Sequence, residues 1–243
     1  NVCGTILPVV EAGAFCRAHG LRFFVDAAQT GGTVPIHMQE MHIDALAFTG
    51  HKGLLGPQGI GGFILGEDMP MELEPLLSGG TGSVSHKEEM PDFMPDRFEA
   101  GTLNLPGIAG LCAGLDWLEK TGIHRIARHE LDLTEQFLAG LNGLKARGLG
   151  IEILGKMGRE GRTGVVSIRT PGHGLAQTAA RLDEAYGIMT RVGLHCAPYA
   201  HRTLGTFPEG TIRFSFGWWN RAEQVEAAVE ALGRILAEES DGF

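Results

Sequence analysis

The sequence predicts an α/β protein, and three observations support this fold class. Short apolar runs of strand length alternate with stretches of helical periodicity in the first half of the chain. Turn-forming glycines separate many of these runs, as expected where strands and helices succeed one another. The second half repeats the alternation on a smaller scale. This pattern indicates two α/β units rather than one uniform bundle or sandwich.

The first half contains one predicted helix and three predicted strands. Pro8 to His19 is expected to be helical, with a proline near its first turn and a glycine at its end. The predicted strands are the apolar runs 21–25, 43–48 and 61–65. Residues 77–104 are rich in Gly, Ser, Pro and charge and lack periodicity. A loop of that length within a domain is usually functional.

The second half begins with a helical pattern and continues as a smaller α/β unit. Residues 105–144 are expected to be helical, with a break near Gly122. Further strands are predicted at 164–169, 188–192 and 211–216. Further helices are predicted at 174–186 and from Asn220, as the cap, to about Glu238. We therefore expect a large domain over residues 1–135 and a small domain over 136–243. The chain begins in what reads as the middle of a fold, so we expect the large domain to be incomplete at its N-terminus.

Composition argues against several classes of function. The formal net charge is −9 and no Lys/Arg-rich run is present, which disfavours nucleic-acid and anionic-membrane partners. The four cysteines are scattered without a CxxC spacing, so neither a zinc site nor a disulfide framework is expected. That pattern fits a reducing cytoplasm. No apolar run approaches the ~20 residues that cross a bilayer, and no signal peptide is visible.

Two segments at the ends of predicted strands carry the first chemical signal. Asp26 opens the segment DAAQT, and Lys52 lies within AFTGHKG. An isolated lysine at a strand end is usually a surface residue, but here a carboxylate follows a neighbouring apolar run. Ligands of open α/β sheets bind at the carboxyl ends of strands. A lysine in a partly desolvated position favours Schiff-base chemistry, and a carboxylate can keep the ring nitrogen of pyridoxal phosphate protonated.

DAAQ followed by TGHKGLLGPQGIG resembles the cofactor segment of class V aminotransferases and cysteine desulfurases. The resemblance extends to RFEAGTLN (Arg97 to Asn104) and to NVCGT (Asn1 to Thr5), and so covers nearly the whole chain. It implies a fold-type-I enzyme dependent on pyridoxal phosphate, with a large αβα domain and a smaller C-terminal α/β domain.

The resemblance also implies roles for individual residues. Lys52 would carry the cofactor, Asp26 would pair with its pyridine nitrogen, and Gln29 would lie near its phenolic oxygen. Asn1 would lie near the ring oxygen and the substrate carboxylate. The cofactor phosphate would be held by Thr49 and His51 and, from a neighbouring subunit, by Gly101 and Thr102. The last pair implies a homodimer.

A second set of residues surrounds Cys196. An isolated cysteine is usually a small buried residue, but a neighbouring histidine, here His195, can activate a thiol as a thiolate. The Arg-Gly-HCAP pattern resembles the active-site loop of the short-loop cysteine desulfurases and selenocysteine lyases. Arg213 resembles the family arginine that binds the substrate carboxylate, and its planar fork suits that contact. Arg191 matches a family arginine beside the substrate; for each of these two arginines the alternative is a surface charge.

The resemblance implies conversion of L-cysteine to L-alanine, with sulfur transferred to Cys196 as a persulfide. L-Selenocysteine would react by the same route, and a sulfur-acceptor protein is a further expected partner. One alternative is a class V aminotransferase or related lyase without sulfur transfer. Another is an inactive truncated fragment, because the phosphate-gripping turn and the ring-stacking residue of the family are not found in the sequence.

Overall fold

The computed structural model describes residues 1–238. The chain divides into two compact units, one of residues 8–123 and one that joins residues 1–7 to the chain from His124 onward. The expected limit at residue 135 lies within the helix Ile123–Ala146, whereas the division between the units lies at the start of that helix. The domain ranges 1–135 and 136–243 stay a prediction.

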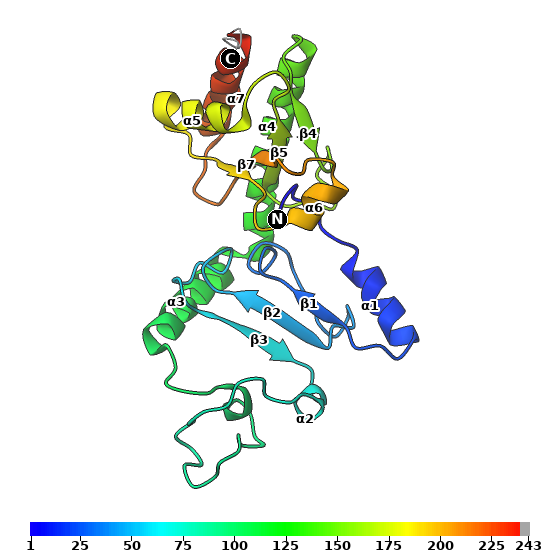
Figure 1. Cartoon of the computed structure of the whole chain (residues 1–243), viewed down its shortest axis with the longest axis vertical. Helices are drawn as coiled ribbons and strands as arrows, with labels where there is room; N and C mark the ends of the chain where they lie inside the picture. The colour runs from blue at the N-terminus through cyan, green and yellow to red at the C-terminus, as the bar shows by residue number, and fades with distance from the viewer. Residues whose placement is uncertain (239–243) are drawn as a thin grey trace. The chain divides into compact units, whose positions relative to one another are not determined.

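The unit of residues 8–123 is built on a three-stranded mixed sheet (Figure 1). Its strands are ordered β1-β2-β3, with β1 parallel to β2 and β2 antiparallel to β3. Its elements are α1 (Val9–Ala18), β1 (Phe24–Asp26), β2 (Ala45–Thr49), β3 (Gly61–Leu65), α2 (Met69–Glu72), the 3₁₀ helix η1 (Asp96–Phe98) and α3 (Leu105–Thr121). The helix and the three strands expected here are therefore present, with β1 shorter and later than expected.

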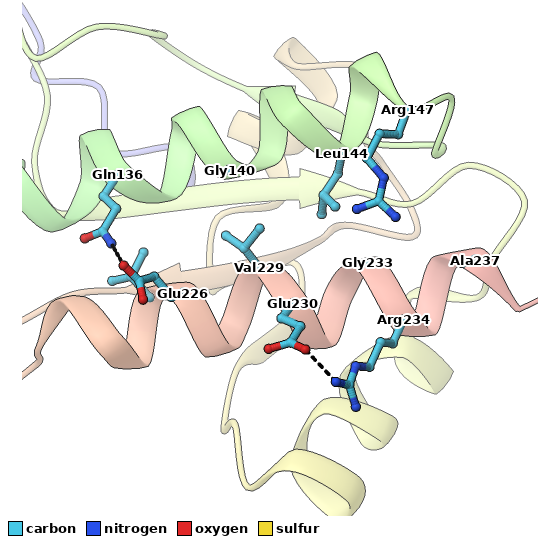
Figure 2. Close-up of a pocket in the computed structure, with 11 residues that line it drawn as sticks. Gln136, Gly140, Leu144, Arg147, Glu226, Val229, Glu230, Gly233, Arg234 and Ala237 are labelled. Carbon is cyan, nitrogen blue, oxygen red and sulfur yellow. Dashed lines mark hydrogen bonds and ion pairs between the residues drawn. The ribbon is translucent and has the colours of Figure 1, made fainter.

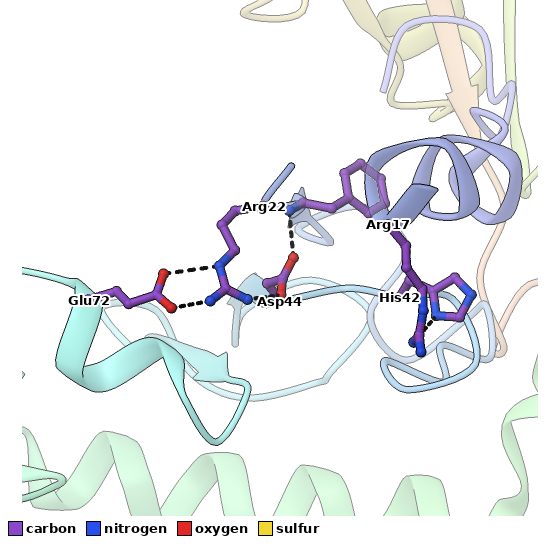
Figure 3. Close-up of polar contacts among 6 residues, drawn as sticks. Arg17, Arg22, His42, Asp44 and Glu72 are labelled. Carbon is purple, nitrogen blue, oxygen red and sulfur yellow. Dashed lines mark hydrogen bonds and ion pairs between the residues drawn. The ribbon is translucent and has the colours of Figure 1, made fainter. Parts of the chain in front are cut away.

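Polar contacts ahead of β1 explain why the strand starts late and fix its register. The Phe23 N–H donates to Oδ2 of Asp44 at 2.7 Å instead of extending the ladder. Arg22 donates to the other oxygen of Asp44 at 3.0 Å and pairs with both oxygens of Glu72 in α2 (Figure 3). Such exposed pairs stabilise little by themselves. Their effect here is geometric, because they hold the entry of β1 beside the entry of β2.

The second unit is an antiparallel sheet of order β4-β5-β7-β6, packed against helices. Its elements are α4 (Ile123–Ala146), β4 (Glu152–Leu154), β5 (Val165–Arg169), α5 (Leu175–Tyr186), β6 (Arg191–Gly193), α6 (Pro198–Thr203), β7 (Thr211–Ser215) and α7 (Ala222–Ala237). The sequence did not predict β4 or α6, which are short. Asn220 does not cap α7: its side chain accepts from Gly217 N at 2.9 Å, and Arg221 is the cap.

The main core lies in this second unit. Phe137 of α4 is fully buried and its ring contacts those of Phe214 and Phe216. Helices α4 and α7 pack closely because Gly140 leaves room for Val229, and the open groove beside this contact is rimmed by the Gln136–Glu226 hydrogen bond (Figure 2). Burial of these apolar side chains supplies most of the stabilisation of such a unit.

The first residues of the chain belong to this unit because they pack on β5. The Thr163 N–H donates to Gly4 O at 2.8 Å, and the Ser167 hydroxyl donates to Val2 O. A Cβ at Gly4 would collide with the carbonyl of Val165, so glycine permits the close approach. This packing carries Asn1 to the sheet. Across residues 1–238, no helix combines the length and the apolar character needed to cross a membrane.

Glu130 is a buried carboxyl group on α4. Its side chain is 8% exposed, and burial raises its pKa to about 7 from an ordinary value of 4.5. The folded protein therefore holds this proton at pH values where the unfolded chain has lost it. Stability from this group is fully present below pH 4.5 and falls as the pH rises to about 7.

We predict that Glu130→Gln removes this pH dependence. The free energy of unfolding of the variant, relative to the native chain, should rise between pH 5 and pH 8 by roughly 1–3 kcal/mol. Urea unfolding at the two pH values measures the difference. Glu184→Gln, on the exposed face of α5, is the matched control and should show no such change. An equal effect of Glu130→Gln at both pH values would contradict the assignment.

Candidate active site

The first group of predicted site residues lies at the carboxyl ends of β1 and β2. Asp26 is the last residue of β1 and pairs in register with Ala47 of β2. The Ala27 N–H continues the ladder to Ala47 O at 2.8 Å. Oδ1 of Asp26 accepts from Ala28 N at 2.8 Å, which fixes the carboxylate at the strand end. The parallel register therefore brings the DAAQT and TGHKG segments to the same edge of the sheet.

Glycines bring the two segments into backbone contact beyond the strands. A Cβ at Gly32 would collide with the carbonyl of Gly53, and a Cβ at Gly53 would collide with the carbonyl of Gly31. Gly32 also has a φ of 87°, a conformation that glycine adopts without strain. These contacts leave the turns after β1 and β2 at van der Waals distance. Asp26 and Lys52 flank this tightly packed pair of turns.

Lys52 lies in the turn that follows β2, and the Leu55 N–H closes that turn on Lys52 O at 2.9 Å. The hydroxyl of Thr49 lies 2.9 Å from Nδ1 of His51, so these two predicted phosphate ligands are already joined. The partial desolvation expected for Lys52 is not found, because its turn projects past the strand and the side chain is exposed.

Gln29, Gly101 and Thr102 are also exposed in this unit. Gly101 has a φ of 88° and its N–H donates to Gly80 O at 2.8 Å, which closes part of the long segment 77–104 on itself. Glycine is needed at that backbone conformation. The expected contact of Gly101 and Thr102 with a neighbouring subunit stays a prediction.

The second group of predicted site residues lies on β6 and β7. Arg191 and Arg213 are directly paired in the antiparallel register. Neither guanidinium forms an ion pair with a carboxylate in residues 1–238. Burial lowers the pKa of Arg213, and the charge of Arg191 lowers it further. The Nε atom of Arg213 is buried without a hydrogen-bond partner in the described chain. Two neighbouring cations with an unused donor are suited to bind an anion such as a carboxylate.

Asn1 belongs to this second group. Nη1 of Arg213 donates to the side-chain oxygen of Asn1 at 2.6 Å and to its backbone oxygen at 3.1 Å. The Asn1 side chain in turn donates to His195 O at 2.5 Å. Asn1 thus contacts the arginine predicted to bind the substrate carboxylate, and its own place near that carboxylate stays a prediction. Its expected contact with the cofactor ring stays a prediction.

Cys196 is exposed at a tight turn between β6 and α6. Nη2 of Arg191 donates to Sγ of Cys196 at 3.2 Å. The Ala197 N–H donates to Leu194 O at 2.8 Å, and the two central residues both have positive φ, 48° at His195 and 61° at Cys196. Residues other than glycine rarely adopt this backbone conformation. The structure therefore presents the thiol on a constrained turn beside a cation.

His195 is not placed to activate the thiol as its sequence position suggested. Its side chain is 3% exposed, and Nε2 forms a 2.9 Å hydrogen bond with the hydroxyl of Thr211. Burial, together with the charges of Arg213 and Arg191, lowers the pKa of His195 to about 4. The ring is therefore neutral near pH 7, and the group in contact with Sγ is Arg191.

Thr211 was missed by the sequence analysis. It is fully buried and lies two residues before Arg213 on β7, so both side chains project from one face of the strand. That alternation was the signal that could have identified it. Behind it, the buried His201 bonds the Thr206 hydroxyl at 2.7 Å and lies 5.4 Å from the His195 ring, centroid to centroid.

The residues of the first group fit pyridoxal phosphate. A carboxylate and a hydroxyl come from the last residues of β1 and β2, and an imidazole and an amine come from the turn after β2. The collisions that a Cβ would cause at Gly32 and Gly53 show how closely the turns after these strands are held. Lys52 would hold the aldehyde carbon of the cofactor, Asp26 its ring nitrogen, and Thr49 with His51 its phosphate. When bound, the cofactor supplies a ring that accepts the electrons released at the substrate α-carbon.

Several known proteins are similar to this chain over most of its length. A probable cysteine desulfurase of Methanothermobacter thermautotrophicus is 36% identical over 97% of this chain, which covers 58% of that relative. A cysteine desulfurase of Escherichia coli is 34% identical, and 56% of it is covered. The solved apo structure of the cysteine desulfurase of Thermococcus onnurineus has a TM-score of 0.87 at 36% identity, with 97% of this chain and 57% of that one aligned.

The chain thus spans a little over half the length of the relatives it matches. The solved neighbours are desulfurases of fold type I, which confirms the fold class predicted from the sequence. The family model for class V aminotransferases matches residues 1–228. Members of that family depend on pyridoxal phosphate. This chain belongs to the class V aminotransferase family.

Proposed function

We propose that the enzyme carrying this chain is a cysteine desulfurase dependent on pyridoxal phosphate. The observation that carries the proposal is the contact of Cys196 with Arg191, beside the cross-strand partner Arg213. A thiol in contact with one cation, next to a second without a carboxylate partner in the described chain, suits a nucleophile beside a carboxylate-binding site. The relatives named as desulfurases support the same assignment.

The proposed reaction converts L-cysteine and the Cys196 thiol into L-alanine and a Cys196 persulfide. Arg213 would bind the substrate carboxylate and Arg191 would hold the thiolate. Lys52 would remove the α proton and Asp26 would keep a proton on the cofactor ring nitrogen. The Cys196 thiolate attacks the substrate sulfur, the carbon–sulfur bond breaks, and its electron pair stays with the substrate fragment that becomes alanine. Atoms and electrons balance without an external oxidant.

Several parts of this proposal reach beyond the described residues. The homodimer would place Gly101 and Thr102 at the phosphate of the neighbouring subunit. A sulfur-acceptor protein would receive the persulfide sulfur, and L-selenocysteine would be a second substrate. The cytoplasmic location is proposed only from the scattered cysteines.

The alternative of a class V aminotransferase or lyase without sulfur transfer is not favoured, because the relatives carry the desulfurase name. The alternative of an inactive fragment is tested by turnover.

We predict that Lys52→Ala abolishes covalent attachment of the cofactor and all turnover, because Lys52 is the amine at the strand end beside Asp26. Borohydride reduction of the full-length enzyme, followed by mass spectrometry, should fix the cofactor mass on the peptide that contains Lys52. Lys87→Ala removes an exposed lysine of the same unit and should leave both attachment and turnover unchanged. Cofactor fixed elsewhere in Lys52→Ala would disprove the assignment.

We predict that Cys196→Ala still binds cofactor and L-cysteine but forms no persulfide and releases no sulfide. The reason is that proton transfer and sulfur acceptance are assigned to different residues. Sulfide release and the spectral change on adding L-cysteine are measured in the same full-length preparation. Cys112→Ala, which removes an exposed cysteine of α3, serves as the control. Sulfide release at the native rate in Cys196→Ala would favour the class V aminotransferase or lyase instead, and survival of selenocysteine turnover alone would favour a selenocysteine lyase.

A further inference from the structure

The turn that presents Cys196 needs a restraint. Its two central residues, His195 and Cys196, both occupy the left-handed region, as in the hairpin turns usually built from glycine and asparagine. Side chains with a Cβ seldom populate this region unless the surrounding structure holds them there. One backbone hydrogen bond, from Ala197 N to Leu194 O, closes the turn. A single backbone hydrogen bond does not by itself hold a turn of unfavourable conformation.

The contacts of His195 supply that restraint. Its ring is almost fully buried, and Nε2 is joined to the buried hydroxyl of Thr211 on β7 at 2.9 Å. Its carbonyl accepts from the Asn1 side chain at 2.5 Å. At the base of the turn, a Cβ at Gly210 would collide with the carbonyl of Gly193, so the backbone just before the turn is in direct contact with the residue that precedes β7. His195 thus ties the turn to β7 through a buried side chain, whereas Cys196, the other central residue, is exposed.

We propose that His195 is a positioning residue: its buried ring, bonded to Thr211, holds the turn in its left-handed form and keeps the thiol of Cys196 on Arg191. This inference rests on the proposed function only in giving the thiol a role, since the geometry is independent of it. The ring acts on the thiol through the backbone that joins His195 to Cys196.

The charges around the ring favour this role over acid–base catalysis. Arg213, Arg191 and His201 are the charged or titratable groups that act on His195, and each disfavours a positive ring. A neutral ring adds no cation to the pair of arginines that faces the thiol. The His195 ring can therefore anchor the turn at neutral pH without changing the positive charge that Arg191 and Arg213 place near the thiol.

The test is the rate at which iodoacetamide labels Cys196, read peptide by peptide, with exposed Cys112 in the same molecule as the internal reference. His195→Gly permits the left-handed backbone without strain but removes the ring. It therefore separates the effect of the ring contacts from the effect of the backbone conformation. We expect the labelling ratio of Cys196 to Cys112 to fall roughly fivefold to tenfold, because the reactive thiolate loses its cationic partner. His195→Gln, whose amide can bond Thr211, should restore most of the ratio.

Two further variants keep the test decisive. Thr211→Val removes the hydroxyl but keeps nearly the same side-chain shape. It should lower the labelling ratio of Cys196 to Cys112, as His195→Gly does. His173→Gln, a histidine of the same unit outside the turn, should leave it unchanged. Amide exchange of β5 and β7 reports that each variant is folded. An unchanged or increased ratio in His195→Gly or Thr211→Val overturns the proposal, as does equal slowing by His195→Gly and His195→Gln. Labelling needs neither cofactor nor turnover, so absence of desulfurase activity in the native enzyme would count against the proposed function and not against the positioning role.

Discussion

The register between neighbouring strands is the constraint on which both groups of site residues depend. In the first unit, the parallel pairing of Asp26 with Ala47 places the carboxylate at the same sheet edge as the turn that carries Lys52. In the second, the antiparallel pairing sets Arg191 opposite Arg213. A shift of one residue in either ladder would turn these side chains to the other face of the sheet. The chemistry assigned to this chain therefore rests on backbone hydrogen bonds more than on contacts among the functional side chains.

Close backbone approach is the second recurring device. Glycines at positions 32 and 53 allow the turns of the cofactor segment to touch, and Gly210 does the same beneath the Cys196 turn. Any side chain at these positions would separate the segments. The high glycine content of the chain thus has a specific structural use at both groups of site residues, where polar side chains must project from neighbouring turns.

In the second unit, burial shifts the pKa of two titratable side chains, His195 and Glu130. The His195 ring stays neutral because it is buried near two arginines, and the thiol of Cys196 lies at their exposed side. Glu130, buried on α4, instead titrates near neutral pH. The two groups give the free energy of unfolding opposite pH dependences. His195 lowers it as the pH falls below 6.5, the ordinary pKa of histidine, because the buried ring resists protonation. Glu130 lowers it as the pH rises towards 7, because the buried carboxyl resists ionisation. Because the His195 ring is neutral near pH 7, Arg191 and Arg213 are the cations of this site that can bind an anion.

The sequence by itself determined the fold class, the family and the identity of most candidate residues. Apolar periodicity and strand-end motifs are local properties, so β2, β3 and the long helices were close to their predicted limits. The start of β1 was misplaced because the side chain of Asp44, distant in sequence, takes the N–H of Phe23. Tertiary structure alone decided that His195 points to Thr211 while Arg191 reaches the thiol, and that Asn1 joins Arg213. The physical reason is that side-chain partnership depends on strand register and burial, which bring together residues that no local pattern connects.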